Sequence, residues 1–234
     1  MQDKKFSLQE ALKYGFSATM EHAQLLLGVY GFLLLFQASK ILLFWLVYHN
    51  LPFTNLSEFS SFLLSSKNPA VQYVNNKPII TQAGLIFSVL NAIRAFVYVA
   101  LYLGFIQISL DIYDKDKSSF ATLFSRWRLL LRSIGATILM GLATVAGLIC
   151  LIIPGLWIAA RLALFMEVLV DTNTGVINSL KRSFAITRGV ALKLFACGLV
   201  TTLINMLSVV GFVVTIPPMM LAWTYIYRQL DKQA

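Results

Sequence analysis

The chain has 234 residues, of which 58% are hydrophobic and only 12% are charged. Since a soluble globular domain carries about 25% charged residues, this composition excludes an ordinary water-soluble fold. The formal net charge of +9 does not indicate nucleic-acid binding. Lys and Arg are concentrated in short segments between long apolar runs, the distribution expected of charges that face the cytoplasm and anionic lipid headgroups.

The apolar runs predict an all-α fold, a polytopic transmembrane helix bundle that forms one integral membrane domain over residues 1–234. A spanning helix needs about 20 mostly apolar residues. The fourth and sixth runs are shorter than this, so an alternative has four or five spans with re-entrant hairpins. The six spans expected, in chain order, are residues 25–48, 85–110, 134–153, 156–170, 194–214 and 218–227.

The basic residues predict that both termini lie in the cytoplasm. In that orientation only two basic residues of the spans' connections, Lys67 and Lys77, lie outside. Reversing the chain would reverse this bias, against the positive-inside rule. The fourteen basic residues placed inside are Lys4, Lys5, Lys13, Lys115, Lys117, Arg126, Arg128, Arg132, Lys181, Arg182, Arg188, Lys193, Arg228 and Lys232.

Three connections are expected on the outer side. Residues 50–82 form one long polar loop, and the other two are tight turns built around Pro154-Gly155 and Pro217-Pro218. Proline ends a helix because it lacks an N–H donor and clashes with the preceding turn, and glycine permits the backbone to reverse.

A basic amphipathic segment precedes the first, third and fifth spans, which predicts a threefold repeat with units of about 6–110, 118–170 and 174–230. Such helices lie in the headgroup layer with their apolar face toward the lipid. The alternative is that they are the cytoplasmic ends of ordinary spans, bent at Gly15 or Gly189. The expected apolar positions are Leu8, Leu12 and Phe16, then Phe120 and Phe124 with Arg128 as the exception, then Val176, Leu180 and Phe184. The interfacial basic residues are Lys13, Arg126, Arg128, Lys181, Arg182 and Arg188.

Four charged residues fall inside the expected spans: Lys40, Arg94, Arg161 and Glu167. A basic residue at the bilayer centre costs about 2.5–3.5 kcal/mol on insertion scales, so each must face protein or water, or reach the interface. Lys40 can extend outward. Arg94 and Arg161 are expected to face the bundle interior, where they bind either an anionic ligand or lipid phosphate, or the backbone carbonyl groups of neighbouring helices.

The remaining reactive residues indicate no cofactor, no metal and no enzymatic activity. Cys150 and Cys197 each lie inside an apolar run and have no metal-binding or disulfide spacing. His22 and His49 are expected at opposite membrane interfaces, too far apart to form one site.

Several short stretches resemble a YciC-like family of bacterial membrane proteins, which is similar to the membrane domain of some glycerophosphodiester phosphodiesterases. The resemblance implies a multi-pass protein of the bacterial inner membrane with no established function; the catalytic barrel of the phosphodiesterases is absent here. The stretches are Phe6 to Leu12, Ile153 to Trp157, Arg161, Val170-Asp171, Ser179 to Phe184, Thr187 to Gly189 and Tyr225 to Tyr227.

Three functions are consistent with these features. The first is a non-enzymatic protein that associates with membrane lipids through anionic headgroups, or with envelope proteins, and that can form a homo-oligomer. The second is a small transporter or channel subunit whose anion-preferring path is lined by Arg94 and Arg161. The third, an enzyme acting on lipid headgroups, is least favoured because Glu167 is the only acid within a span.

Overall fold

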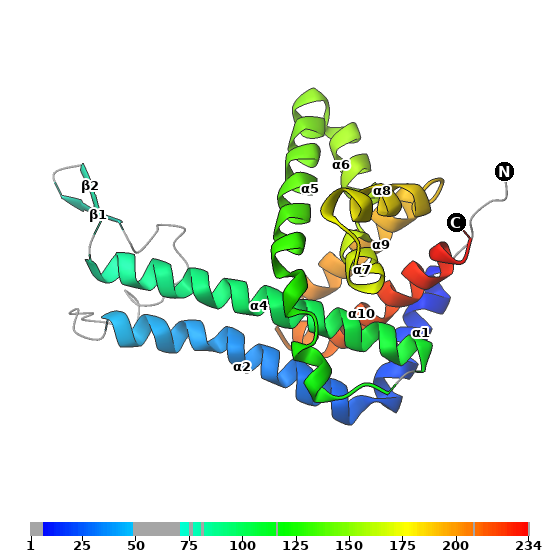
Figure 1. The fold of residues 1–234 in the computed structure, drawn as a ribbon, viewed down its shortest axis with the longest axis horizontal. Coiled ribbons are helices and arrows are strands. Elements are labelled where there is room, and N and C mark those ends of the chain that lie inside the picture. Colours follow the sequence, from blue (N-terminus) through cyan, green and yellow to red (C-terminus); the bar gives the residue numbers. More distant parts are fainter. Residues whose placement is uncertain are drawn as a thin grey trace. The chain divides into compact units, whose positions relative to one another are not determined.

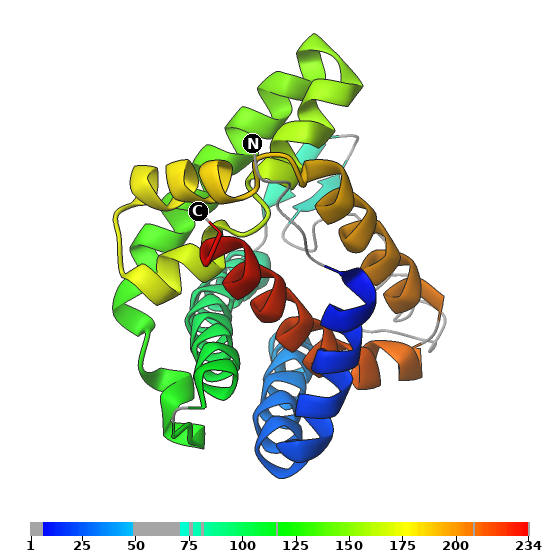
Figure 2. The ribbon, with the colours of Figure 1, turned by 90° about the vertical axis from the view of Figure 1, so that its right-hand side faces the viewer.

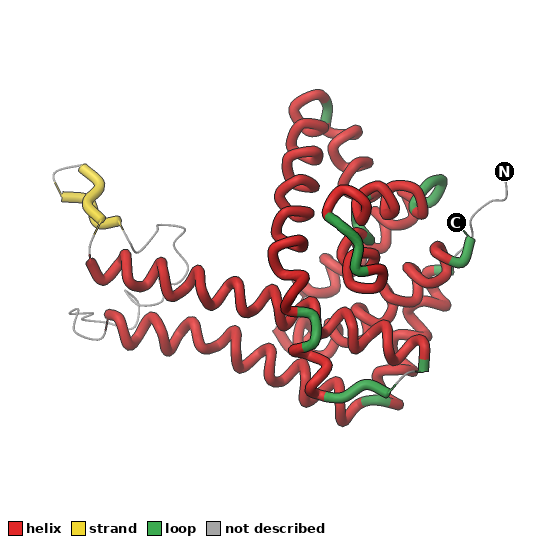
Figure 3. Tube along the Cα trace, in the orientation of Figure 1, coloured by secondary structure: helices red, strands yellow, loops and turns green. Residues whose placement is uncertain are grey.

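A computed structural model describes residues 7–48, 71–74, 77–80, 82–115, 117–207 and 209–233, and these are mainly helical (Figures 1 and 3). The only strands in that part of the chain form a short antiparallel pair, β1 (Val71–Val74) and β2 (Lys77–Ile80), with Val71 opposite Ile80. The helices are α1 (Leu8–Glu21), α2 (Ala23–Tyr48), α4 (Gln82–Asp114), α5 (Leu130–Cys150), α6 (Ile152–Arg161), α7 (Phe165–Thr172), α8 (Val176–Ile186), α9 (Ala191–Leu207) and α10 (Val209–Asp231).

The chain divides into two compact units, and the single membrane domain expected from the sequence stays a prediction. The first comprises Met1–Tyr30 and Ala100–Ala234, and the second comprises Gly31–Val99. The second unit contains the C-terminal part of α2, the strand pair and the N-terminal part of α4. Each unit is held by contacts among its own residues, for example the edge-to-face rings of Phe44 and Phe87 in the second unit, whose centroids lie 5.9 Å apart.

Four segments are long and apolar enough to cross a membrane: Ala23–Leu46, Leu85–Asp114, Phe120–Ile149 and Ile152–Thr172. A fifth candidate combines Val176–Ile186 with Ala191–Leu203, although these two helices meet at an angle of 103°. The chain therefore has the helices of a membrane protein. The last two expected spans fall on α9 and α10, and some side chains of both helices lie outside the described residues, so six spans remain a prediction.

The proline turns differ from the expected ones. Pro217 and Pro218 lie inside α10, so the expected turn at this position is wrong. Neighbouring helices can compensate for the hydrogen bond that proline removes from a membrane helix, and α1 packs against this part of α10. The other reversal occurs at Leu151, which is extended, and Pro154 follows in the first turn of α6, where a missing N–H leaves no carbonyl unpaired.

Ser7 caps the start of helix α1, because its hydroxyl accepts a hydrogen bond from the Glu10 N–H at 3.4 Å. The face that packs against α10, however, carries small residues, Ala11, Gly15 and Ala18. The two helices lie side by side in both ribbon views (Figures 1 and 2). Close approach of the backbones selects this small face, and it leaves Phe16 47% exposed.

The second and third amphipathic segments also depart from the predicted pattern. Residues 120–129 form two 3-10 turns, η1 (Phe120–Phe124) and η2 (Trp127–Leu129), instead of an α-helix. Helix α8 does form, but Leu180 packs with Ala136, Leu162 and Phe165, and Val176 contacts the same cluster. Because Val176 and Leu180 contact protein, most of the apolar face that was expected to touch lipid packs against other helices of the chain.

The contact between α1 and α10 gives a testable prediction. A Cβ atom on Gly15 would lie 2.2 Å from the carbonyl oxygen of Pro218, so Gly15→Ala forces the two backbones apart. We expect it to lower the free energy of unfolding by about 1–3 kcal/mol, the usual cost of overpacking. The control is Gly28→Ala, because a Cβ atom on Gly28 meets no atom within 4 Å. Unfolding in a detergent titration measures both; equal stability of the two variants would contradict the contact.

Candidate functional site

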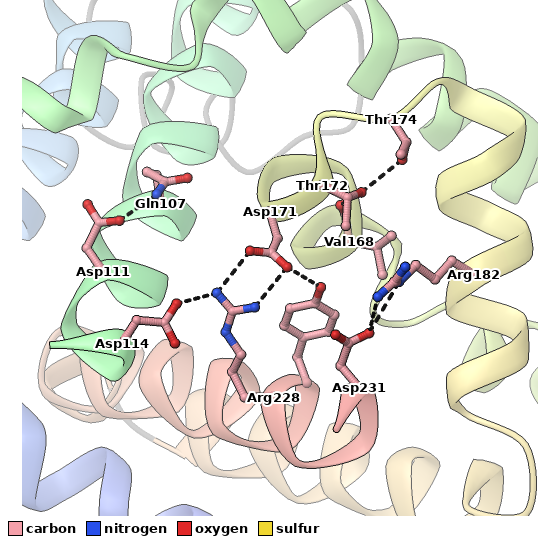
Figure 4. A network of polar contacts seen from close by, with 11 residues as sticks. Gln107, Asp111, Asp114, Val168, Asp171, Thr172, Thr174, Arg182, Arg228 and Asp231 are labelled. Atoms are coloured by element: carbon pink, nitrogen blue, oxygen red, sulfur yellow. Dashed lines mark hydrogen bonds and ion pairs between the residues drawn. The ribbon is translucent and has the colours of Figure 1, made fainter. Parts of the chain in front are cut away.

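A cluster of polar contacts is centred on Arg228 in the last turn of α10 (Figure 4). Its guanidinium group donates to both carboxylate oxygens of Asp171, at 2.8 Å and 2.9 Å, and also to the carboxylate of Asp114. The Tyr227 hydroxyl donates to Asp171 at 2.6 Å. These contacts join the ends of α4, α7 and α10, and we call the four residues the Arg228 hub.

Electrostatics favour the Arg228 hub at this place. Asp114 ends α4, and Asp171 lies in the last turn of α7. The unpaired carbonyl groups of a helix C-terminus carry partial negative charge, which stabilises a nearby cation. Arg228 therefore compensates both the carboxylates and the helix ends. Its side chain is 16% exposed and that of Asp171 is 21% exposed, so the pair is largely removed from water.

Further polar contacts surround the hub. Arg182 of α8 donates to the Asp231 carboxylate at 2.8 Å and 3.2 Å. On α4, Gln107 donates to Asp111 at 2.5 Å and accepts from Arg126 at 2.9 Å. These contacts attach α8 to α10, and the 3-10 turns of residues 120–129 to α4, at the end of the larger unit where the Arg228 hub lies.

Three tyrosine rings pack together beside these polar contacts. The Tyr14 ring centroid lies 5.5 Å from that of Tyr113 and 5.2 Å from that of Tyr225. Burial, followed by the neighbouring Tyr113 and two acidic residues, raises the pKa of Tyr14 to about 12. The ring cluster links α1 to α4 and α10.

Arg161 is only 6% exposed and contacts protein groups, although its Nε atom has no hydrogen-bond partner among the described residues. Its guanidinium group donates to the backbone carbonyl of Phe184 and lies over two rings, 3.9 Å from the Phe184 centroid and 5.0 Å from that of Trp157. Its own carbonyl oxygen accepts bonds from Ser183 at 3.2 Å and Thr187 at 2.8 Å. These contacts favour the structural explanation for Arg161, a carbonyl bond between helices, over a bound anion.

Arg94 also has partners, in this case neutral amides. It donates to the side-chain oxygen of Gln37 at 2.7 Å and to that of Asn91 at 3.1 Å and 3.2 Å. All three residues belong to the second unit, so α2 and α4 share a polar contact along their apolar surfaces. Lys40, on the same unit, is exposed.

Glu167 is the buried charge without a compensating partner. It is 7% exposed, and its Oε2 atom has no hydrogen-bond partner among the described residues. Residues six positions apart do not share a helix face, so the sequence predicts that Glu167 and Arg161 do not pair. Arg161 bonds to the carbonyl of Phe184 instead. Glu167 lines a cavity of about 430 Å³ whose other walls come from α4, α6, α9 and α10.

The predicted interfacial basic residues fall into two groups. Arg126 and Arg182 are held by Gln107 and Asp231. The side chain of Arg182 is nevertheless 48% exposed. The other four are exposed as well; these are Lys13, Arg128, Lys181 and Arg188.

The sequence did not single out the Arg228 hub as a site. Asp114 and Asp171 could have been noticed as acids at the ends of two apolar runs, where a carboxylate needs a basic partner. What the sequence lacks is the pairing, because Arg228 is 57 residues from Asp171 and 114 from Asp114.

No chemistry beyond ion pairing follows from these geometries. Within the described part of the chain, no three His, Cys, Asp or Glu residues are grouped so that they could hold a metal ion. Cys197 is buried, as predicted for a small apolar side chain, and the side chain of Cys150 lies outside the described residues. His49 and most of the expected outer loop lie outside them as well. Comparisons of the chain with protein-family models, curated proteins and solved structures gave no match.

Arg228, paired with Asp171, is more buried than Arg182, paired with Asp231, and this difference yields a prediction. Asp171→Ala leaves the guanidinium group of Arg228 with one fewer buried partner, and we expect a loss of about 3 kcal/mol in unfolding free energy. In the control, Asp231→Ala, the partner Arg182 is 48% exposed, and the loss should be about 0–1 kcal/mol. Adding Arg228→Met to Asp171→Ala should cost less than the sum of the single changes. Additive losses would show that Arg228 and Asp171 do not interact.

Proposed function

We propose that this chain is a non-enzymatic protein of the bacterial inner membrane that associates with anionic lipid headgroups through the basic residues at its cytoplasmic side. The resemblance to the YciC-like membrane family supports the location, and the four membrane-length helices support the multi-pass arrangement. Six spans, cytoplasmic termini and the threefold repeat belong to this proposal, as does association with a second copy or an envelope protein.

One observation carries the proposal: near the Arg228 hub the acids are paired with arginines, whereas many of the basic residues are exposed. Asp114, Asp171 and Asp231 all accept bonds from arginines of the protein. The acids therefore do little to neutralise the remaining cations, and an anionic lipid surface attracts each exposed cation by about 1 kcal/mol. The exposed basic residues outside the expected membrane core are Lys13, Lys115, Lys117, Arg128, Arg132, Lys181, Arg182, Arg188, Lys193 and Lys232, of which Arg182 is paired with Asp231.

The structure changes how the amphipathic segments would contact lipid. In α8 the apolar side chains Val176 and Leu180 contact protein, so we do not propose that this helix inserts a continuous apolar face. Instead, single exposed apolar residues lie beside the basic ones, such as Phe16 at 47%, Trp127 at 66% and Ile177 at 58% exposure. Side chains of this kind contact the boundary between headgroups and acyl chains while the charges bind the headgroups.

The transporter or channel hypothesis is less well supported. It requires the guanidinium groups of Arg94 and Arg161 to be available to an anion. Arg94 is bound by Gln37 and Asn91, and Arg161 is enclosed by Phe184 and Trp157. Both arginines are therefore explained by contacts within the protein.

The proposal predicts selective, salt-sensitive binding of anionic lipid. Native mass spectrometry of the purified protein measures how many phosphatidylglycerol and phosphatidylcholine molecules it retains. We expect preferential retention of phosphatidylglycerol, reduced by salt because exposed charges are screened over about 8–10 Å. The double variant Lys181→Gln, Arg188→Gln should weaken this preference by about 2 kcal/mol at most.

The matched control is Lys40→Gln, which removes an exposed charge from the second unit, within an apolar helix. It should leave the preference unchanged. Equal retention of the two lipids by the unaltered protein, or equal effects of the control and the double variant, would contradict the proposed function.

A further inference from the structure

The cavity next to Glu167 has the composition of a site for a small organic cation. Its volume is about 430 Å³, enough for a compact headgroup. Aromatic side chains from three helices line it: Tyr102 of α4, Phe195 of α9 and Trp223 of α10. Gly198 and Thr202 of α9 complete one wall.

Glu167 supplies the only acidic group in this lining. More than nine-tenths of the residue is buried, and Oε2 has no hydrogen-bond partner in the described part of the protein. Burying an ionised carboxylate without a partner is costly. Arg161, the basic residue six positions away, is committed to Phe184 and Trp157. A ligand that brings a positive charge would satisfy the carboxylate.

The aromatic walls narrow the chemical class of that ligand. Faces of tryptophan, tyrosine and phenylalanine rings attract ammonium groups, and such cages typically recognise quaternary and alkylated ammonium ions. A divalent metal ion fits poorly, because it prefers several oxygen ligands and Glu167 is the only acid here. An anion is excluded by the same carboxylate.

We propose that this cavity binds an organic ammonium group, with Glu167 as its counter-ion and the rings of Trp223, Tyr102 and Phe195 as its cage. The ammonium group can belong to a soluble amine or to the headgroup of a phospholipid. This site is separate from the exposed basic residues of the proposed function, since it selects the opposite charge.

Choline and its neutral isostere 3,3-dimethylbutan-1-ol test the proposal on the full-length protein in maltoside detergent. Equilibrium dialysis measures the binding of each. We expect saturable choline binding, with the isostere about tenfold weaker or more because it lacks the charge. Glu167→Gln should weaken choline binding by about tenfold or more and leave the isostere unchanged. Glu21→Gln, an exposed acid on α1 outside the cavity, is the matched control and should bind choline normally.

Two further measurements separate the possible sources and occupants. Gly198→Leu fills the cavity, since a Cβ atom there already lies 3.9 Å from the Trp223 ring, and it should abolish binding of choline. Native mass spectrometry then compares how much phosphatidylethanolamine and phosphatidylglycerol the protein retains. Retention of phosphatidylethanolamine only when Glu167 is present identifies the ligand as a lipid headgroup. Choline binding without that retention identifies the ligand as a soluble amine.

Three results would overturn the proposal. The first is equal binding of choline and its isostere, which indicates an uncharged apolar cavity. The second is unchanged choline binding by Glu167→Gln. The third is the absence of both choline binding and Glu167-dependent retention of ethanolamine lipid. None of these results alters the retention of phosphatidylglycerol, so failure here and failure of the proposed function are distinguishable.

Discussion

The Arg228 hub is the contact through which the larger unit of this protein is held at one end. In a chain that is 58% hydrophobic, apolar contacts between helices are poorly directional, whereas a bidentate ion pair fixes distance and orientation. Arg228 makes such a pair with Asp171 and also reaches Asp114. The same helix, α10, also carries Pro218, whose backbone lies against Gly15 of α1.

The other charges inside apolar segments are accommodated in three different ways. Arg94 bonds to neutral amides within its own unit, and Arg161 bonds to a backbone carbonyl between two aromatic rings. Glu167 has no comparable partner for Oε2 and lines a cavity instead. Arg94 and Arg161 therefore stabilise contacts between helices, whereas Oε2 of Glu167 lacks a partner among the described residues. This contrast is why we assign a binding role to Glu167 and a structural one to the arginines.

The helices α2 and α4 and the start of α1 at Ser7 were predictable, because long apolar runs and helix caps are local signals. Pro217 and Pro218 misled the prediction, since proline normally interrupts a helix and only packing against α1 explains their place in α10. Sequence periodicity identified Leu180 as apolar but could not say whether lipid or the cluster around Phe165 covers it. The partners of Arg228 and the cavity around Glu167 were equally hidden, because they depend on tertiary contacts between distant residues.

The central claim is that the Arg228 hub gathers the ends of α4, α7 and α10 on one side of the membrane. Labelling of single cysteines with a membrane-impermeant reagent tests it, in a background of Cys150→Ala and Cys197→Ala. Lys117→Cys, Asn178→Cys and Gln233→Cys change exposed residues next to the three helix ends. All three should label only after permeabilisation, whereas Ser65→Cys in the expected outer loop should label in intact cells. Labelling of Asn178→Cys and Gln233→Cys from opposite sides would contradict the account.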